Sequence, residues 1–587
     1  MLLALVAFAL VDTQLASSRT RPSSNGLSPP QAAQPAAEWF TERARAVGVD
    51  FAHFNGMSGE YYFEEIMGSG AALLDFDNDG DLDVYVVQGQ MLGPRKTLAD
   101  ALIPPRMPLP LTDRLYRNDV EAHADGSRTL RFTDVTKGSG LDVQSYGMGV
   151  TTGDFDNDGW IDLYRTRRGA AQMFRNNGNG TFTDVSARTG TNQSAWSVSA
   201  SFLDFDRDGW LDLYVGNYVN NDDSRKCLSA LGERDYCGPQ GFEPVPDRLY
   251  RNRGNGTFAD VTAIAQVARE YGRAMGIVAA DVNGDGWTDI YVANDMSENL
   301  LWLNQRDGTF KNGALLAGVA LDQSGAVQAG MGVDAGDVDN DGDEDLFVTN
   351  LGTQYNTLYV NNGSGLFEDR STASGLGSAR QRYTGFGTLF FDYDNDGWLD
   401  VLIVNGAVFT KRALAAAKDP YPLHEPNQLF RNLGNGRFEE VTARAGAVFQ
   451  LSEVSRGAAF GDLDNDGDTD VLVTNNSGPM RLLVNNIGNR NRWLGLRLVG
   501  GKPPRDMLGA RVGVFRKEGP PLWRRARTDG SYASAHDPRV LVGLGAATAV
   551  PRVRVVWPSG RIEEWTDLKV NEWRTLTEGT GQLQSGR

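Results

Sequence analysis

Seven short runs of carboxylates, each wrapped around one glycine, are the residues of this 587-residue chain whose types and spacing could do chemistry. The nine-residue runs begin at Asp75, Asp154, Asp204, Asp281, Asp337, Asp392 and Asp462. Positions 1, 5 and 9 are Asp in every copy, position 3 is Asp in six copies, and position 6 is always Gly. Hard oxygens at alternate residues, turned inward by a glycine that can adopt a positive φ, form the ligand set that Ca²⁺ prefers.

A solvated turn is the alternative explanation for one such run, because Asp, Asn and Gly favour turns for local reasons. Seven copies in one register argue against it, since two like charges ~4 Å apart repel by about 4 kcal/mol at an effective dielectric of roughly 20. A cation in each loop relieves that repulsion, so the sequence predicts up to seven Ca²⁺ ions. The expected ligands, with the backbone carbonyl acting at position 7 where that residue is Trp, are Asp75, Asp77, Asp79, Asp81, Asp83, Asp154, Asp156, Asp158, Trp160, Asp162, Asp204, Asp206, Asp208, Trp210, Asp212, Asp281, Asn283, Asp285, Trp287, Asp289, Asp337, Asp339, Asp341, Asp343, Asp345, Asp392, Asp394, Asp396, Trp398, Asp400, Asp462, Asp464, Asp466, Asp468 and Asp470.

The residues after each loop indicate which kind of calcium loop this is. An EF-hand requires an acidic twelfth residue on a helix, whereas the twelfth residues here are Val86, Arg165, Val215, Val292, Val348, Ile403 and Val473. An apolar, β-branched run such as Val84–Val87 follows position 9 instead, which is typical of a strand. Each loop is therefore predicted to join two strands, with the Asp at position 9 as the closing ligand.

The elements that position the loops repeat with them. A Gly-rich strand precedes each loop, a strand follows it, and a third strand carries a signature such as Leu115-Tyr116-Arg117-Asn118. A fourth strand, such as Thr181–Val185, ends most repeats. The loops begin 50 to 79 residues apart, and four strands per repeat at that spacing are typical of the blades of a β-propeller.

The predicted fold is all-β, with a seven-bladed propeller over residues 38–488 and a small β-rich domain over 489–580. The seventh repeat lacks its fourth strand, and residues 39–43 offer one. The N-terminal strand is therefore expected to complete the last blade and to close the ring. Specificity is expected to reside in inserts that emerge at the faces of the propeller, namely residues 88–112, 217–246 and 405–427.

These motifs resemble those of a known family. The Asp-x-Asp-x-Asp-Gly-x-x-Asp loops with their Gly-rich approach strands resemble the FG-GAP (VCBS) repeats that are also found in integrin α-chain propellers. The tail resembles the ASPIC/UnbV domain in the segments Leu508–Val512, Asp529–Ser534, Val542–Gly545 and Val555–Gly560. Over about residues 39 to 580 the chain is similar to the cartilage acidic protein family, which implies a secreted, calcium-binding protein of the matrix or cell surface. Ala535-His536 depart from the polar Gln-type residue that this resemblance leads one to expect.

The charge of the chain is unevenly distributed. The formal charge is −18, but the seven loops hold 31 of the 75 acidic residues, so bound Ca²⁺ would offset much of it. Nucleic-acid binding by the main body is therefore not expected. From Arg490 onward 18 basic residues accompany 9 acidic ones, a net charge of +9. Two interpretations stay open: a patch for acidic glycans, phospholipid headgroups or a protein, or docking of residues such as Arg524 and Arg525 on the acidic rim of the propeller.

The N-terminus and the cysteines predict an exported protein. Residues 1–18 combine an apolar run with small residues near Ala16, as expected of a secretory signal peptide, and residues 19–37 are expected to be a disordered linker. No other stretch reaches the ~20 apolar residues of a transmembrane helix. Cys227 and Cys237 are expected to form a disulfide, with two free thiols as the alternative. The predicted location is extracellular, or the periplasm or cell surface in a bacterium.

The sequence favours a binding protein over an enzyme. Its four histidines are dispersed, and it lacks the short motifs of metalloproteases, α/β-hydrolases and dinucleotide-binding enzymes. The Trp residues at loop position 7 are expected to pack against the fold rather than to act as sugar platforms. We therefore expect a calcium-binding adhesion or matrix scaffold with a protein or acidic-glycan partner. The alternative is a calcium-dependent enzyme acting on a polysaccharide or a secondary metabolite, which Asp, Glu, Arg and Tyr converging on one channel mouth would favour.

Overall fold

The computed structural model describes residues 38–124, 128–229, 232–377 and 383–584. The expected signal peptide and linker, residues 1–18 and 19–37, lie outside this part of the chain. Within it the fold is all-β, as predicted, and no helix is long and apolar enough to cross a membrane. Its short α-helices are α1 (Ser186–Thr189), α2 (Ala314–Ala317), α3 (Ser371–Ser374) and α4 (Arg412–Ala416).

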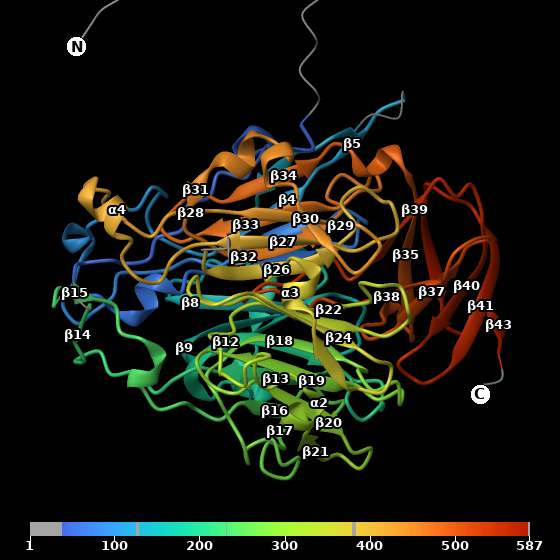
Figure 1. Cartoon of the computed structure of the whole chain (residues 1–587), viewed down its shortest axis with the longest axis horizontal. Coiled ribbons are helices and arrows are strands. Elements are labelled where there is room, and N and C mark those ends of the chain that lie inside the picture. Colours follow the sequence, from blue (N-terminus) through green and yellow to red (C-terminus); the bar gives the residue numbers. More distant parts are fainter. Residues whose placement is uncertain (1–37, 125–127, 230–231, 378–382, 585–587) are drawn as a thin grey trace, which may run out of the picture. The chain divides into compact units, whose positions relative to one another are not determined.

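Antiparallel meanders of four strands follow one another along the chain, one for each carboxylate loop (Figure 1). We number these repeats 1 to 7 by their loops; each loop joins the first strand of its repeat to the second. Repeats 1 to 3 consist of β2 (Ala71–Leu74), β3 (Asp83–Val86), β4 (Arg114–Asn118) and β7 (Phe132–Asp134); β8 (Gly147–Gly153), β9 (Asp162–Ala170), β10 (Gln172–Asn176) and β11 (Phe182–Asp184); and β12 (Ser194–Leu203), β13 (Asp212–Asn217), β16 (Arg248–Asn252) and β17 (Phe258–Asp260). Repeats 4 to 6 consist of β18 (Ala274–Ala280), β19 (Asp289–Asn294), β20 (Leu300–Asn304) and β21 (Phe310–Asn312); β22 (Val333–Gly336), β23 (Asp345–Val348), β24 (Thr357–Asn361) and β25 (Phe367–Asp369); and β26 (Gly385–Phe391), β27 (Asp400–Asn405), β29 (Gln428–Asn432) and β30 (Phe438–Glu440).

Repeat 7 takes its fourth strand from the other end of the chain. Its own strands are β32 (Ser455–Gly461), β33 (Asp470–Asn475) and β34 (Arg481–Asn485), and β1 (Phe40–Glu42) pairs antiparallel with β34. The N-terminal strand therefore completes the last repeat, as the sequence predicts. Apolar side chains of repeats 1 and 7 then share one buried core, which includes Leu73 and Leu472.

The repeats form a closed ring. Among the described residues, the first strands contact one another in the order β2, β8, β12, β18, β22, β26, β32 and back to β2. Small residues allow this close approach: a Cβ at Gly149 of β8 would lie only 2.5 Å from the carbonyl oxygen of Val198 on β12. A larger residue at that position would force the two strands apart.

An asparagine at the end of each third strand ties its repeat to the preceding one. Its side-chain amide donates to the backbone carbonyl at position 2 of the preceding loop, at 2.7 or 2.8 Å in every case. The asparagine of repeat 1 bonds the loop of repeat 7, which closes the circle. The donors are Asn118, Asn176, Asn252, Asn304, Asn361, Asn432 and Asn485.

The C-terminal domain contains two sheets around its own apolar core. Buried Leu494, Val512, Val553 and Trp557 belong to that core. One sheet contains β35 (Arg492–Gly500), β36 (Arg505–Asp506), β39 (Val540–Gly545) and β42 (Trp573–Thr577), and the other β37 (Arg511–Phe515), β38 (Leu522–Arg525), β40 (Val550–Val556), β41 (Ile562–Leu568) and β43 (Gln582–Leu583).

The two ends of the ring carry different structures. Successive connections of an antiparallel meander alternate between its ends, so the carboxylate loops mark one end, the loop face, and connections from second to third strands mark the other, the insert face. Two of the predicted inserts provide α4 and the pair β14 (Cys227–Leu228) and β15 (Arg234–Asp235) at the insert face (Figure 1). Two further small pairs are β5 (Glu121–Ala122) with β6 (Arg128–Thr129) and β28 (Glu425–Pro426) with β31 (Ser452–Glu453).

Candidate metal sites and their cover

Each carboxylate loop folds around its own first residue. In repeat 1 the two oxygens of Asp75 accept hydrogen bonds from the backbone N–H groups of Asp79 at 3.1 Å and Gly80 at 3.2 Å. Gly80 has a φ of +94°, which its missing side chain permits. The carboxylate thus holds the chain in the tight turn that the spacing of the acidic residues predicts.

This turn brings part of the predicted ligand set together. In at least five loops one carboxylate oxygen from each of positions 1, 3 and 9 lies within 4.8 Å of the other two. Five such groups are Asp75, Asp77 and Asp83; Asp154, Asp156 and Asp162; Asp204, Asp206 and Asp212; Asp337, Asp339 and Asp345; and Asp392, Asp394 and Asp400. In repeat 4, Asn283 takes position 3, so Asp281 and Asp289 are the carboxylates at these three positions.

The carboxylate oxygens at position 3 show whether the loops are suited to bind a cation. Oδ1 of Asp77, Asp156, Asp339 and Asp394 is buried and has no hydrogen-bond partner. Buried polar atoms normally have a partner, and a buried carboxylate oxygen left without one is strongly unfavourable. A hard cation among the three clustered carboxylates would satisfy these oxygens, so the residues present fit the calcium that the sequence predicts.

Position 9 has a structural role that the sequence analysis did not anticipate. One oxygen of Asp83 accepts from the backbone of Phe76 at 3.0 Å, and the other accepts from Asn118 at 2.8 Å. The same two contacts recur in the other repeats, as with Asp162, Phe155 and Asn176. The residue expected only to close the metal site therefore also fixes the loop to the third strand. Because the third-strand donor is a backbone N–H group, no residue type in the sequence signalled this role.

Position 5 turns out to be held by other groups as well. Oδ1 of Asp158 accepts from the backbone of Trp160 at 3.0 Å, and its Oδ2 lies 2.5 Å from Arg175, which also contacts Asp156. Arg251 and Arg431 make the equivalent pairs in repeats 3 and 6. In these repeats an arginine of the third strand partly neutralises the loop.

Burial makes ionisation of these loops unfavourable without a cation. Loss of solvent, with a smaller contribution from Asp158, raises the pKa of Asp154 to about 7. Burial likewise raises the pKa of Asp204 to about 6 and that of Asp337 to about 7. A divalent ion reverses this balance because it favours the charged carboxylates.

The Trp residues at position 7 pack within the fold. A Cβ at Gly178, Gly254 or Gly434 would lie 2.7 to 2.9 Å from the indole of Trp160, Trp210 or Trp398 respectively. Each glycine belongs to the Asn/Gly turn after the third strand, so the indole lies over that turn.

The C-terminal domain covers the loop face. Arg505 donates to the carbonyl of Gly209 at 2.6 Å, and Arg511 donates to that of Gly342 at the same distance. Buried Arg525 pairs with buried Glu344 at 3.1 Å. Of the two interpretations of the basic tail, docking on the acidic rim therefore applies to these arginines. The domain contributes no carboxylate to the five clusters.

One segment of this domain fills the middle of the ring. Residues 528–537 form hydrogen bonds to all seven first strands: to β2 through Ala535, to β8 and β12 through Ala533, to β18 through Asp529, to β22 and β26 through Ser531, and to β32 through His536. We call it the plug. The segment with the departure at Ala535-His536 is thus a buried part of the fold, with both residues 3 % exposed or less.

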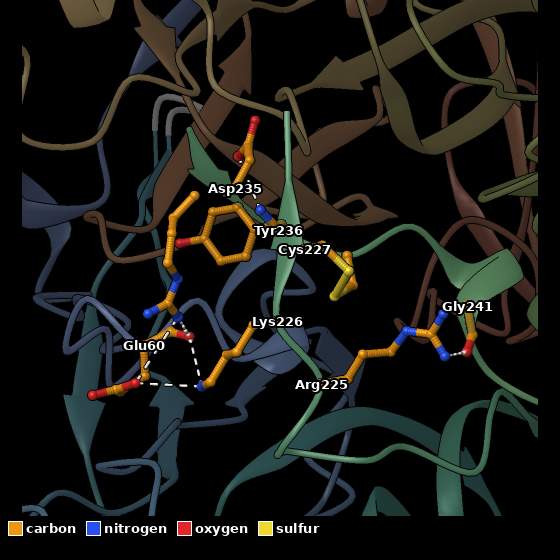
Figure 2. Close-up of a disulfide and its surroundings, with 9 residues drawn as sticks. Glu60, Arg225, Lys226, Cys227, Asp235, Tyr236 and Gly241 are labelled. Carbon is orange, nitrogen blue, oxygen red and sulfur yellow. Dashed lines mark hydrogen bonds and ion pairs between the residues drawn. A yellow bond between two sulfur atoms is a disulfide. The ribbon is translucent and has the colours of Figure 1, made fainter. Parts of the chain in front are cut away.

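The predicted disulfide is present at the insert face. Cys227 and Cys237 are bonded, and Figure 2 shows this bond beside Tyr236. Lys226 lies 3.3 Å from the carboxylate of Glu60, and Arg234 donates to the Glu60 carbonyl at 2.8 Å. The disulfide therefore fixes an insert that is also bound to the segment preceding repeat 1.

Fold and site together define a class: a propeller-type ring of repeats with carboxylate loops, covered by a C-terminal domain. The model of the FG-GAP-like repeat matches residues 154–215, 236–292, 281–348, 337–403 and 414–473, and the model named ASPIC and UnbV matches residues 500–583. The chain belongs to the FG-GAP-repeat proteins that carry a C-terminal ASPIC and UnbV domain.

Curated relatives agree with this assignment. Cartilage acidic protein 1 of Mus musculus and that of Homo sapiens are each 27% identical to this chain over 338 residues. The match covers 55% of this chain and 48% or 47% of theirs, so the chain spans about half the length of the curated relatives it matches. A solved structure, YCF48 bound to D1 peptide, covers 78% of this chain and all of its own at 8% identity, with a TM-score of 0.39. That similarity is too low to inform function.

Proposed function

We propose that this protein is a secreted calcium-binding scaffold whose loops hold up to seven Ca²⁺ ions. The observation that carries this proposal is the set of buried, unpartnered oxygens at position 3, each beside two further carboxylates. Positions 1, 3 and 9 would supply the carboxylate ligands. Bound calcium would supply positive charge, which allows the loops to ionise and become rigid.

Secretion is supported by three independent features. A disulfide joins Cys227 to Cys237, which is typical of oxidising compartments. Extracellular calcium sites of modest affinity work at millimolar concentrations of the ion. The N-terminal residues 1–18 have the composition of a signal peptide. An adhesion or matrix role with a protein or acidic-glycan partner follows from the resemblance to cartilage acidic protein.

Because the C-terminal domain covers the loop face, the partner is expected to bind elsewhere on the protein. Several arginines of the C-terminal domain are engaged by the propeller, and the plug fills the ring centre. The insert face therefore offers the irregular loops on which recognition normally depends. A screen against glycans and matrix proteins, with and without Ca²⁺, tests this role. If a variant that lacks the α4 insert binds the same partners with the same affinity, recognition lies elsewhere on the protein.

Calcium stoichiometry tests the metal assignment directly. Equilibrium dialysis of the full chain should give several bound Ca²⁺ per molecule, with seven as the maximum. Asp156→Ala removes a position-3 ligand and should reduce the number bound by about one. Asp307→Asn is the matched control, because Asp307 lies in an exposed turn outside the loops. A stoichiometry of zero, or equal loss in both variants, contradicts the proposal.

A further inference from the structure

A cavity of about 800 Å³ opens at the insert face. Its walls come from the segment before repeat 1, the disulfide insert and the α4 insert. Tyr532 of the plug belongs to the same buried cluster as the wall residues Met57, Tyr236 and Tyr421. The plug thus occupies the ring centre below this cavity, which has the size and partly apolar lining of a small-molecule site.

Three tyrosines give the cavity an aromatic wall. Tyr61 and Tyr236 meet edge to face, with ring centroids 5.1 Å apart. The Tyr236 hydroxyl donates to Glu65 at 3.0 Å, and the Tyr421 hydroxyl accepts from Asn476 at 2.7 Å. Internal contacts therefore already engage the hydroxyl groups of Tyr236 and Tyr421. The aromatic wall therefore interacts with a ligand chiefly through the faces of its rings, which carry negative electrostatic potential.

Glu65 is the group that lacks a partner. It is 0% exposed, its Oε2 accepts from Tyr236, and its Oε1 has no hydrogen-bond partner. Among the described residues no arginine or lysine forms an ion pair with it; the nearby buried Arg456 instead donates to the carbonyl of Ile66 at 2.7 Å. The ionisable groups that face it are Glu64, Tyr62, Tyr146, Tyr236 and Tyr421. A buried carboxylate without a cation is unfavourable, and its missing partner is a hydrogen-bond donor.

The other charges of the wall also favour a cation. Glu233, Asp235 and Asp419 line the cavity together with Arg234 and Arg412. Arg234 is engaged by the carbonyl of Glu60 and lies over the Tyr61 ring, 5.4 Å from its centroid. Acidic groups therefore exceed basic ones along the wall even before Glu65 is counted.

We propose that this cavity binds an organic ammonium ion, with Glu65 as its counter-ion and the tyrosine rings as its aromatic wall. The ammonium group donates to Oε1 and gains cation–π attraction from the rings. Converging Glu, Asp, Arg and Tyr are what the enzyme alternative would also require, but the buried, unpartnered Oε1 of Glu65 in the described part of the wall identifies a binding group. The assignment is independent of calcium, because none of these residues belongs to a loop.

Proton linkage gives the assignment a distinctive signature. Burial raises the pKa of Glu65 to about 7, and the hydrogen bond from Tyr236 opposes the rise. A bound cation favours the charged carboxylate and lowers this pKa. Binding should therefore release a proton below pH 7 and tighten by up to about tenfold per pH unit until Glu65 is ionised.

Calorimetric titration of the calcium-loaded full chain tests this, with the primary diamines putrescine and cadaverine as probes and glucose as the neutral comparison. We expect both ammonium probes to bind, glucose not to bind, and proton release at pH 6 in buffers of different ionisation enthalpy. Glu65→Gln should weaken binding at least tenfold and remove its pH dependence. Glu60→Gln, whose carboxylate pairs with Lys226 outside the cavity, should leave both unchanged.

A second variant protects the test against misfolding. Tyr236→Phe keeps the ring but removes the hydrogen bond that holds the pKa of Glu65 down, so the pH midpoint of binding should move upward while the probes still bind. Four outcomes would each overturn the assignment. Two concern the variants: unchanged binding in Glu65→Gln, or an unchanged pH midpoint of binding in Tyr236→Phe. Two concern the probes: glucose binding as tightly as putrescine, or neither ammonium probe binding. Failure here leaves the calcium stoichiometry of the loops untouched, so the two proposals are tested separately.

Discussion

The loop face and the insert face of one ring are built in opposite ways. At the loop face one motif recurs in every repeat, and backbone carbonyls of these loops accept from neighbouring repeats or from the C-terminal domain. At the insert face the connections differ in length, one is fixed by a disulfide, and a cavity remains. Repetition at one end accompanies ring closure and a shared candidate metal site, whereas irregularity at the other leaves room for recognition.

Chelation should have the largest effect, and it should act on the loop face. If each site holds Ca²⁺ at about tenfold its dissociation constant, binding adds about 1.4 kcal/mol per site, or about 10 kcal/mol over seven sites. Calorimetry in excess EGTA should show a large fall in Tm that Ca²⁺ reverses better than Mg²⁺, which sheds water reluctantly. Hydrogen exchange should increase first in the loops. An unchanged melt, or exchange that increases first around the disulfide, contradicts the contrast between the faces.

Breaking an ion pair between Arg527, the residue before the plug segment, and the ring should have the next largest effect. Asp334 on β22 is fully buried and receives hydrogen bonds from Arg527, one of them at 2.8 Å. Arg527→Ala leaves that carboxylate buried and unpaired, which costs about 3–5 kcal/mol. Chemical denaturation measures the loss. Arg552→Ala is the control, because Arg552 is 40% exposed and lies 3.5 Å from Glu564; a similar loss in both variants would show that the buried Arg527–Asp334 pair contributes no more than an exposed one.

The loop face could be predicted from the sequence, and the reason is repetition. Seven aligned copies reveal the turn at Gly80, the strand after Asp83 and the missing strand supplied by Phe40–Glu42. The partners of each loop could not be read this way, because the Asn118 amide reaches a carbonyl 345 residues away.

The plug and the cavity were beyond reach of the sequence for a different reason. Each occurs once in the chain, so it cannot be recognised by aligning repeated copies of a motif. Asp529–Ser534 was identified only as a motif of the tail, and the contacts of the whole plug with all the first strands depend on how the two domains dock. Glu65 lies outside every motif, and its burial arises from packing against inserts that are hundreds of residues away, as with Tyr421.

Removing the disulfide should affect the insert face alone. The bond closes a loop over a sequence separation of 10 residues, for which chain entropy gives a stabilisation of about 3 kcal/mol. The double variant Cys227→Ser, Cys237→Ser should lose up to that amount and expose Lys226 and Arg234 to proteolysis. Calcium stoichiometry should not change. Loss of bound calcium in this variant would mean that the two faces are coupled.

Removing the cation–π contact between Arg207 and Trp287 should have the smallest effect on stability. This change tests how much one link between adjacent loops contributes by itself. In repeats 1 and 2 the position-4 asparagine donates to the glycine carbonyl of the next loop, as Asn78 does to Gly159 at 2.9 Å and Asn157 to Gly209 at 3.1 Å. Repeat 3 has Arg207 instead, whose guanidinium lies 4.4 Å from the centroid of the Trp287 ring.

Arg207→Ala should therefore lower the free energy of unfolding by about 0.5–1 kcal/mol, the range of a partly exposed cation–π pair. Arg207→Asn introduces the residue type that five of the other loops have at this position. It should recover stability only if its amide reaches the next carbonyl, because the hydrogen bond then replaces the ring contact. Urea denaturation in saturating Ca²⁺ resolves the two variants. A loss of several kcal/mol in Arg207→Ala would mean that adjacent loops fold as one cooperative unit, so that the loop face could not be treated as a sum of seven separate sites.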